Sequence, residues 1–120
     1  MEKKVSEYSD YIKFIDEKSG NYNANMLFPI KIIKNNFFTK DELVNHLQKN
    51  GIETRPVMAG NFVKQPVINL IPHRISGSLK NSTEIMENAF LIGNHQDIDE
   101  SMRKYVSKII IEFLKSKIKL

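Results

Sequence analysis

The last quarter of the chain holds the pattern that most restricts its fold. Apolar side chains recur there at intervals of three and four residues: Met102, Tyr105, Val106, Ile109, Ile110, Phe113 and Leu114. This spacing predicts an amphipathic helix with one broad buried stripe, which needs a second layer to cover it. Asp97 and Glu100 have the spacing of a capping box, so we expect the helix to begin there.

A second helix is predicted between two short strands. Thr39 and Glu42 form a capping box, and Gly51 suits the left-handed conformation that ends a helix. The preceding run at residues 26–33 is apolar and reads as a strand, with Pro29 expected near a sheet edge or at the strand's start. Residues 52–55 read as a second strand.

Two further helices complete the expected elements. Residues 3–17 have apolar side chains at helical spacing, and Asn81 and Glu84 offer a capping box for a short helix through Phe90, stopped by Gly93 and Asn94. Helices and short strands are therefore mixed, and the prediction is one α+β domain in two layers spanning residues 1–120.

Composition narrows the classes of function. The chain has no cysteine, which excludes a disulfide framework, a thiolate zinc site and a cysteine-held iron–sulfur cluster. No apolar run approaches the roughly 18 residues of a membrane helix, and no secretory signal is visible. We therefore expect a cytoplasmic protein that does not bind a membrane.

Charge and histidine placement add two negative expectations. The formal net charge is +4 and the pI about 9.3, but the lysines are spread along the chain without a recognition motif, so nucleic-acid binding is not expected. His46, His73 and His95 stand far apart, which predicts no metal site, and His46 is expected at the surface.

The long segment from Val57 to Lys80 is irregular, and loops of this length are often functional. Just before it, Glu53 and Arg55 would share one face of a strand. The planar guanidinium of Arg55 suits a phosphate or carboxylate, and Glu53 could orient it or accept sugar hydroxyls. The alternative is a solvent-exposed ion pair on an edge strand, and the residues alone leave both open.

A second polar stretch, residues 91–97, lies between two predicted helices. It precedes a helix N-terminus that could attract an anion. The alternative is a plain turn in which Gly93 stops one helix and Asp97 caps the next.

Three segments, in order, resemble the C-terminal part of the DegT/DnrJ/StrS-type sugar aminotransferase family, closest to its NDP-4-keto-6-deoxyhexose 3-dehydratase branch. They are LFPIKI (residues 27–32), TKDELVNHLQKNGIETRPVMAGNFVKQPV (residues 39–67) and NSTEIMENAFLIGNHQDID (residues 81–99). The resemblance spans roughly residues 5–118.

The resemblance implies a fold type I PLP enzyme in which this chain is the C-terminal small domain, with a short, mainly antiparallel sheet against helices. PLP or PMP and the catalytic residues would belong to a large domain outside these 120 residues. The chain alone would therefore bind no cofactor, contain no catalytic residue and be inactive. Glu53 and Arg55 would contact a nucleotide-linked keto-deoxysugar, with Arg55 at a phosphate, and Asn61 and His95 would line the pocket.

The resemblance further implies an enzyme of deoxysugar synthesis for lipopolysaccharide or O-antigen, homodimeric when whole. The absence of cysteine favours cluster-free dehydratases or an ordinary aminotransferase, and leaves that choice open. The alternative function is a stand-alone binding or interaction module, from a truncated or split gene, without enzymatic activity.

Overall fold

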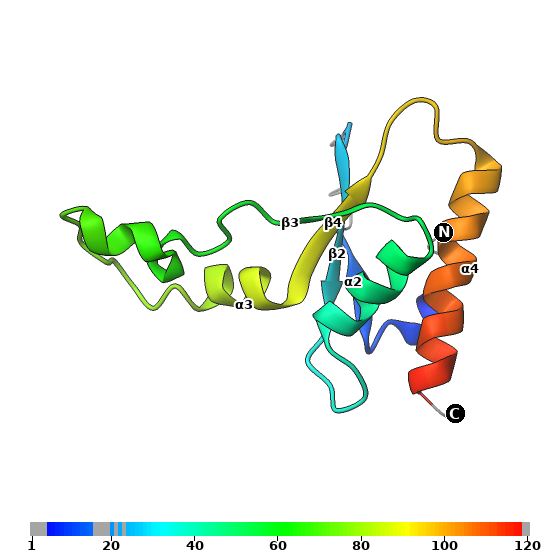
Figure 1. Ribbon diagram of the computed structural model, residues 1–120, viewed down its shortest axis with the longest axis horizontal. Coiled ribbons are helices and arrows are strands. Elements are labelled where there is room, and N and C mark those ends of the chain that lie inside the picture. The colour runs from blue at the N-terminus through cyan, green and yellow to red at the C-terminus, as the bar shows by residue number, and fades with distance from the viewer. Residues whose placement is uncertain (1–4, 16–19, 21, 23, 119–120) are drawn as a thin grey trace.

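The computed structural model describes residues 5–15, 20, 22 and 24–118 as a sheet covered by helices (Figure 1). Four strands lie in the order β1-β2-β4-β3, and each adjacent pair is antiparallel. The strands are β1 (Ile12–Phe14), β2 (Leu27–Ile32), β3 (Thr54–Pro56) and β4 (Ala89–Gly93). The helices are α2 (Lys40–Lys49), α3 (Lys80–Asn88) and α4 (Glu100–Lys117), with short 3₁₀ helices at Ser6–Tyr8, Phe62–Lys64 and Pro66–Leu70. The predicted α+β class and antiparallel sheet are confirmed.

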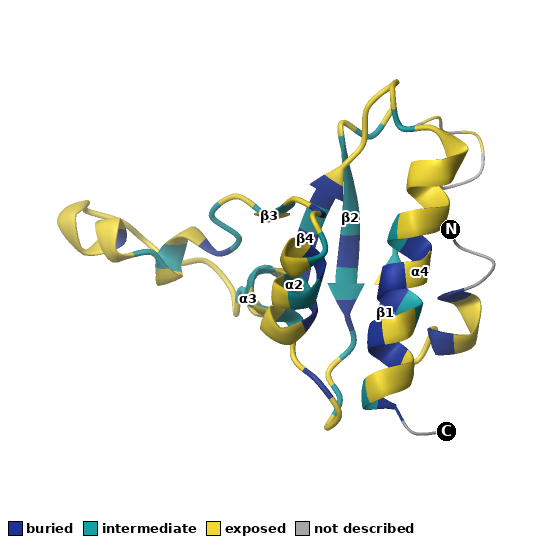
Figure 2. Ribbon diagram, turned by 45° about the vertical axis from the view of Figure 1, so that its right-hand side comes forward, coloured by how far each residue is buried: buried dark blue, intermediate teal, exposed yellow. Residues whose placement is uncertain are grey.

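One face of the sheet carries the hydrophobic core. Ile30 and Phe90 are directly opposed across β2 and β4, and both are buried beneath α2 and α4 (Figure 2). The helices contribute fully buried side chains, among them Leu43 and Leu47 from α2 and Ile110 and Leu114 from α4. Because opposed residues in an antiparallel pair share a face, the neighbouring strand positions point to the other side of the sheet.

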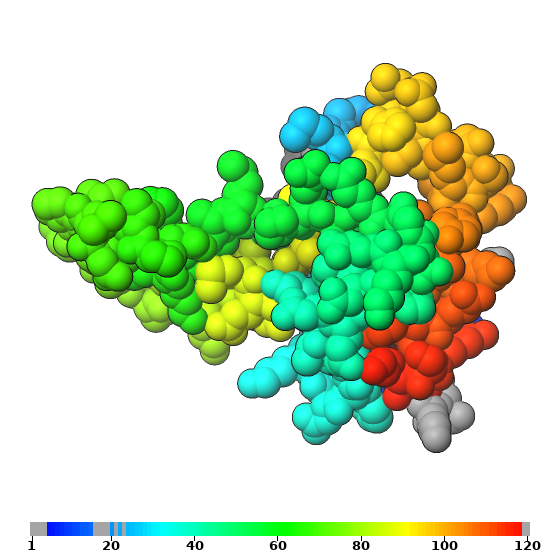
Figure 3. All heavy atoms as spheres, viewed as in Figure 1, coloured from blue at the N-terminus to red at the C-terminus, as the bar shows by residue number. Residues whose placement is uncertain are grey.

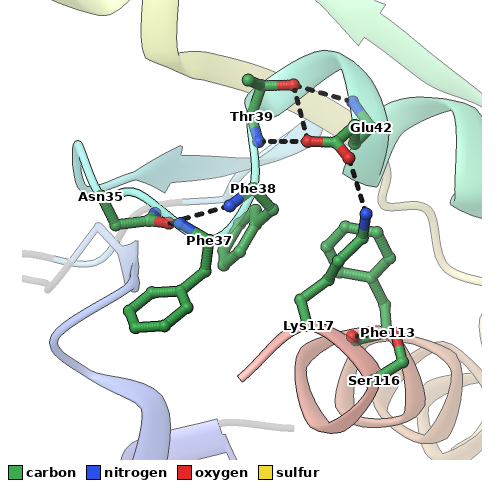
Figure 4. A network of polar contacts seen from close by, with 8 residues as sticks. All are labelled: Asn35, Phe37, Phe38, Thr39, Glu42, Phe113, Ser116 and Lys117. Atoms are coloured by element: carbon green, nitrogen blue, oxygen red, sulfur yellow. Dashed lines mark hydrogen bonds and ion pairs between the residues drawn. The ribbon is translucent and has the colours of Figure 1, made fainter. Parts of the chain in front are cut away.

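The capping box of α2 is confirmed. The Thr39 hydroxyl accepts from the Glu42 backbone N–H at 3.3 Å, and Glu42 Oε2 accepts from the Thr39 N–H at 2.8 Å. The other carboxylate oxygen of Glu42 lies 2.6 Å from Lys117 Nζ, which ties α2 to the end of α4 (Figure 4). This hydrogen bond from Lys117 and the one from the Thr39 backbone hold the pKa of Glu42 below its usual value.

A helix was expected at residues 3–17, of which the structure describes residues 5–15. For these residues the prediction is wrong, and residues 3, 4, 16 and 17 are not described. One 3₁₀ turn at Ser6–Tyr8 leads into β1, where Ile12 pairs with Ile32. Of the apolar side chains in this stretch, Val5, Tyr8 and Ile12 are buried, whereas Ile15 is 62% exposed. A short apolar run is compatible with both a helix and a strand, and here its pairing with β2 makes it a strand.

The central strand β4 was missed. The helix expected through Phe90 ends at Asn88, and Gly93 ends a strand instead of a helix. The capping box of Asn81 and Glu84 is also wrong, since the N-cap of α3 is Leu79, at φ +50° and without a side-chain cap. Glu84 instead forms an ion pair with Lys31 of β2 at 2.6 Å, which lowers its pKa.

Helix α4 begins two residues later than expected. Asp99, not Asp97, caps it, accepting from the Met102 N–H at 2.8 Å. Along the apolar stripe Val106 is half-buried, and the stripe is buried from Ile109 onward. Met102 and Tyr105 are exposed, and the Tyr105 hydroxyl donates to the Asn50 carbonyl at 3.0 Å.

Pro29 lies inside β2 rather than at its start. The pairing with β1 ends at Ile30, so at Pro29 the neighbouring strand is β4 alone. The sheet therefore has a local edge where the proline cannot donate a hydrogen bond. This agrees with the expected edge position.

Residues 57–79 project from the domain as an arm that carries two of the 3₁₀ helices (Figure 1). The principal extents are 49 × 35 × 29 Å, and the radius of gyration is 16.1 Å, above the roughly 13.6 Å of a compact chain of this length. None of the described helices is long and apolar enough to cross a membrane.

Candidate functional site

Arg55 lies in β3, and Glu53 directly precedes that strand, which begins at Thr54 and not at residue 52 as expected; the two side chains nevertheless meet. Arg55 Nη2 is 2.6 Å from Glu53 Oε1, and the two side chains are 65% and 73% exposed. Because β3 is an edge strand, the pair sits at the rim of the sheet. The solvent-exposed ion pair is thus present in the structure.

The strand register places Arg55 on the sheet face away from the core. Arg55 is opposed to Leu91, and Leu91 to Pro29, whereas the core residue Phe90 occupies the alternate position. Arg55, Leu91 and Pro29 therefore lie side by side across the sheet, on the face opposite to the hydrophobic core, and Leu91 and Pro29 are half-buried there. An exposed pair of this kind contributes only about 0–1 kcal/mol, so a phosphate could replace Glu53 as the partner of Arg55 at little cost.

The loop after β4 lies at the same end of the sheet as Glu53. Thr54 is opposed to Ile92, so the residue before β3 is near the exit of β4. His95 in this loop is 58% exposed, and its Nδ1 accepts from the Asp97 N–H at 3.3 Å. Asn94 anchors the loop by donating to the Asn25 carbonyl at 2.6 Å.

The N-terminus of α4 is already occupied by a carboxylate of the chain. Hydrogen bonds from the Met102 N–H and from the Ser101 hydroxyl lower the pKa of Asp99, so it is ionised there at neutral pH. The anion-binding role expected for this helix end therefore has no support from its geometry. The His95 side chain is exposed and could contact a ligand, but the loop itself mainly connects β4 to α4 as a turn.

Asn61 is placed apart from the other three predicted site residues. It is 5% exposed, its Nδ2 donates to Thr83 Oγ1 at 3.0 Å, and its Oδ1 accepts from the Val63 N–H at 3.1 Å. These bonds cap a 3₁₀ helix and fasten the arm to α3. Its observed role is structural.

Sequence reasoning missed a hollow beside Arg55. It has a volume of about 180 Å³ and lies between α2 and β3, on the side of the sheet that α2 covers and not on the face toward which the register turns Arg55. Its lining includes one carboxylate, Asp41, and comprises Lys40, Asp41, Val44, Gln48, Thr54, Arg55, Pro56, Ala89 and Phe90. The spacing Lys40–Val44–Gln48 is i, i+4, i+8, which could have identified this helix face. Sites for drug-sized ligands are typically about 300–1,000 Å³, so the hollow can hold only part of a nucleotide sugar.

His46 is less exposed than the surface position expected from the sequence. It is half-buried against the ring of Phe113, with centroids 5.2 Å apart, and its Nε2 is buried without a partner among the described residues. Within that same part of the chain, no group of three or more His, Cys, Asp or Glu side chains could hold a metal ion.

Comparison with known proteins decides the family. The DegT/DnrJ/EryC1/StrS aminotransferase family matches residues 4–111, nearly the whole chain. The chain belongs to this family. Among relatives, dTDP-4-dehydro-2,6-dideoxy-D-glucose 3-dehydratase of Saccharopolyspora spinosa is 33% identical over 72% of this chain and 19% of its own length. The lipopolysaccharide biosynthesis protein RfbH of Salmonella typhimurium is also 33% identical, over 72% of this chain and 20% of that protein.

Solved structures give the same fold. The GDP-4-keto-6-deoxymannose-3-dehydratase ColD, as its H188N mutant with bound GDP-perosamine, aligns with a TM-score of 0.75 at 24% identity, covering 88% of this chain and 28% of that one. The E. coli GDP-4-keto-6-deoxy-D-mannose-3-dehydratase with hydrated PLP has a TM-score of 0.74 at 24% identity, over 91% of this chain and 28% of that one. This DegT/DnrJ/EryC1/StrS family chain therefore spans less than a third of the length of each relative described here.

Proposed function

We propose that this chain is the small, substrate-binding domain of a PLP-dependent aminotransferase or 3-dehydratase that acts on nucleotide-linked deoxysugars. It supplies one wall of the substrate pocket and does not catalyse the reaction on its own. The observation that carries the proposal is the Glu53–Arg55 pair at the rim of the sheet, on the face away from the core.

Arg55 would bind a phosphate of the nucleotide. Its guanidinium is exposed and carries a fixed charge. Its present partner is Glu53, and breaking this exposed ion pair costs little free energy. Glu53, freed from Arg55, could accept hydrogen bonds from sugar hydroxyls. His95, at the same end of the sheet, would form a further part of the wall, whereas Asn61 would act by holding the arm in place.

The cofactor would be held outside this chain. PLP supplies the electron sink for chemistry at the sugar, and the hollow beside Arg55 is too small for a nucleotide sugar together with PLP. The relatives' greater length and the PLP and GDP-perosamine in two of the similar structures support a second domain that carries the cofactor. The residues of this chain would then bind and orient the nucleotide.

The proposal is tested by titrating GDP-perosamine into the isotopically labelled chain and following its amide resonances by NMR. We expect weak binding, with perturbed resonances at residues 53–55 and 93–97. Arg55→Ala should lower the affinity about tenfold, since one charge-assisted hydrogen bond is lost at an exposed site. Lys115→Ala, which removes an exposed cation from α4, is the matched control and should bind as the wild type does.

A different set of perturbed amide resonances would contradict the proposed substrate-binding role. Resonances that shift only on the arm would favour a stand-alone interaction module over a substrate wall. Equal affinities for the wild type and Arg55→Ala would remove the phosphate role of Arg55.

A further inference from the structure

Met58 combines a strained backbone with an exposed apolar side chain. It is 92% exposed, the largest fraction among the exposed large hydrophobic side chains of the described residues. Its φ of +33° lies in the left-handed region, which a residue with a side chain adopts only at a cost. A single exposed apolar side chain is ordinary, but strain that presents one to solvent does not help the isolated domain.

The other strained residue of the described chain has a structural explanation, which Met58 lacks. Leu79 is the only other non-glycine residue with positive φ among the described residues, at +50°. It is half-buried, and it is the N-cap of α3, where its carbonyl accepts from the Thr83 N–H at 3.0 Å. The conformation of Leu79 therefore begins a helix, whereas Met58 begins no element.

A tight turn holds Met58 close to Arg55. The Met58 N–H donates to the Pro56 carbonyl at 2.9 Å, which closes a three-residue turn directly after β3. Three residues of extended chain span at most about 11 Å, so Met58 lies within the length of a nucleotide from Arg55. Figure 3 shows that the green segment between β3 and the 3₁₀ helices lies at the surface.

The order of side chains along this edge of the sheet matches the order of groups in a nucleotide sugar. Glu53 precedes β3, at the end where β4 leaves the sheet, and Met58 follows Pro56, which is opposed to Phe90 at the other end. Arg55 lies between them. With a phosphate at Arg55 and the sugar toward Glu53, the nucleoside extends toward Met58.

The chemistry of Met58 suits the flat face of a nucleobase. A thioether makes favourable contacts with aromatic rings, and the unbranched side chain adapts to rings of different size. The residues on either side, Val57 and Ala59, are also apolar. These three side chains offer contact area and no hydrogen bond to the edge of the base, so they would hold a base without reading which one it is.

We propose that Met58 packs against the nucleobase of the nucleotide-linked sugar and thereby sets the direction in which the ligand crosses Arg55. This inference rests on the proposed function. The strained turn after β3 then has a purpose, because it presents the side chain to a ligand held by its phosphate at Arg55.

The contact is tested by NMR on the chain labelled at its methionine methyl groups and titrated with GDP-perosamine. Met58→Gly assigns the Met58 methyl resonance by its disappearance. We expect this resonance to move upfield under the ring current of guanine and to show a nuclear Overhauser effect to guanine protons. Met26 and Met102, 80% and 51% exposed, are internal controls whose methyl resonances should not move.

Affinity and stability provide a second test with a matched variant. Met58→Gly should bind GDP-perosamine about fivefold more weakly, because the contact with the base is lost. Leu79→Gly relieves the same kind of strain and should bind as the wild type does. Neither variant should lower the midpoint of urea unfolding, since glycine adopts the left-handed region freely. Equal affinities of the two variants would overturn the inference.

The inference and the proposed function can fail separately. An unmoved Met58 methyl resonance, or an Overhauser effect to the perosamine ring instead of guanine, would overturn the base contact. If the amides of residues 53–55 still shifted and Arg55→Ala still weakened binding, the phosphate site would stand. If Arg55→Ala bound as the wild type did while Met58 still contacted guanine, the phosphate role would fall and the base contact would stand. No binding of GDP-perosamine would overturn both.

Discussion

Substitution of Gly60 by alanine tests whether the arm depends on a close approach to α3. Gly60 has φ +60°, and a Cβ there would lie 2.5 Å from Met86 Cβ and 2.6 Å from Met86 Cγ. The left-handed backbone alone costs an alanine about 1–2 kcal/mol. Displacing Met86 adds about 1–3 kcal/mol, the usual cost of forcing extra atoms into a packed contact.

Gly77→Ala is the matched control within the same arm. Gly77 has φ +74° but nothing within 4 Å of an added Cβ, so it reports the backbone cost without the collision. We expect Gly60→Ala to destabilise the attachment of the arm by about 1–3 kcal/mol more than Gly77→Ala does. This difference isolates the contact between the arm and α3.

Hydrogen–deuterium exchange is the assay, since detachment of the arm is a local opening that global unfolding would underestimate. In Gly60→Ala, faster exchange should appear at the Val63 N–H, which donates to Asn61, and at the other arm amides. The β2 and β4 amides should keep their protection. Equal exchange in Gly60→Ala and Gly77→Ala would refute the reasoning that a packed contact holds the arm.

Two further experiments, with three substitutions, test the helix termini and their charges. Asp99→Ala should lower the free energy of unfolding by about 1 kcal/mol in urea denaturation, because it removes the N-cap of α4. Asp97→Ala should change it much less; the reverse order would contradict the cap seen in the structure. Glu42 has a lowered pKa in the folded state, so its contribution to stability is present above the ordinary value of 4.5 and is lost as pH falls through the lowered one. Urea titrations between about pH 6 and pH 3 should therefore show a shallower loss of stability for Glu42→Gln than for the wild type, and identical slopes would count against the Lys117 contact.

The elements that could be predicted from the sequence were those specified by local interactions. Thr39, Glu42 and Gly51 mark the ends of α2 through bonds and dihedral angles within a few residues, and the structure confirms each. The amphipathic helix α4 is likewise confirmed, although its stripe is buried only from Ile109 onward and its N-cap is Asp99.

The elements that depend on partners distant in the sequence, β1 and β4, were not predicted. Ile12 is in a strand because Ile32 pairs with it, and Phe90 is in a strand because it lies between β2 and β3. Nothing within a short apolar run distinguishes such a strand from a turn of helix.

The candidate site divides in the same way. The period of a strand predicted that Glu53 and Arg55 would lie close together, and the structure shows a direct ion pair between them, although Glu53 precedes β3. That Asn61 is buried and bonded to Thr83 could not be predicted, because the two residues meet only when the arm returns to α3. Their roles toward a substrate stay a prediction.

The affinity of the chain for GDP-perosamine, compared between Arg55→Ala and Lys115→Ala, tests the central claim most directly. A phosphate site at the rim of the sheet predicts about a tenfold loss for Arg55→Ala and none for Lys115→Ala, with the lost perturbations at residues 53–55. Equal affinities in the two variants would contradict it, because Arg55 would then contribute no more than any exposed cation on the surface.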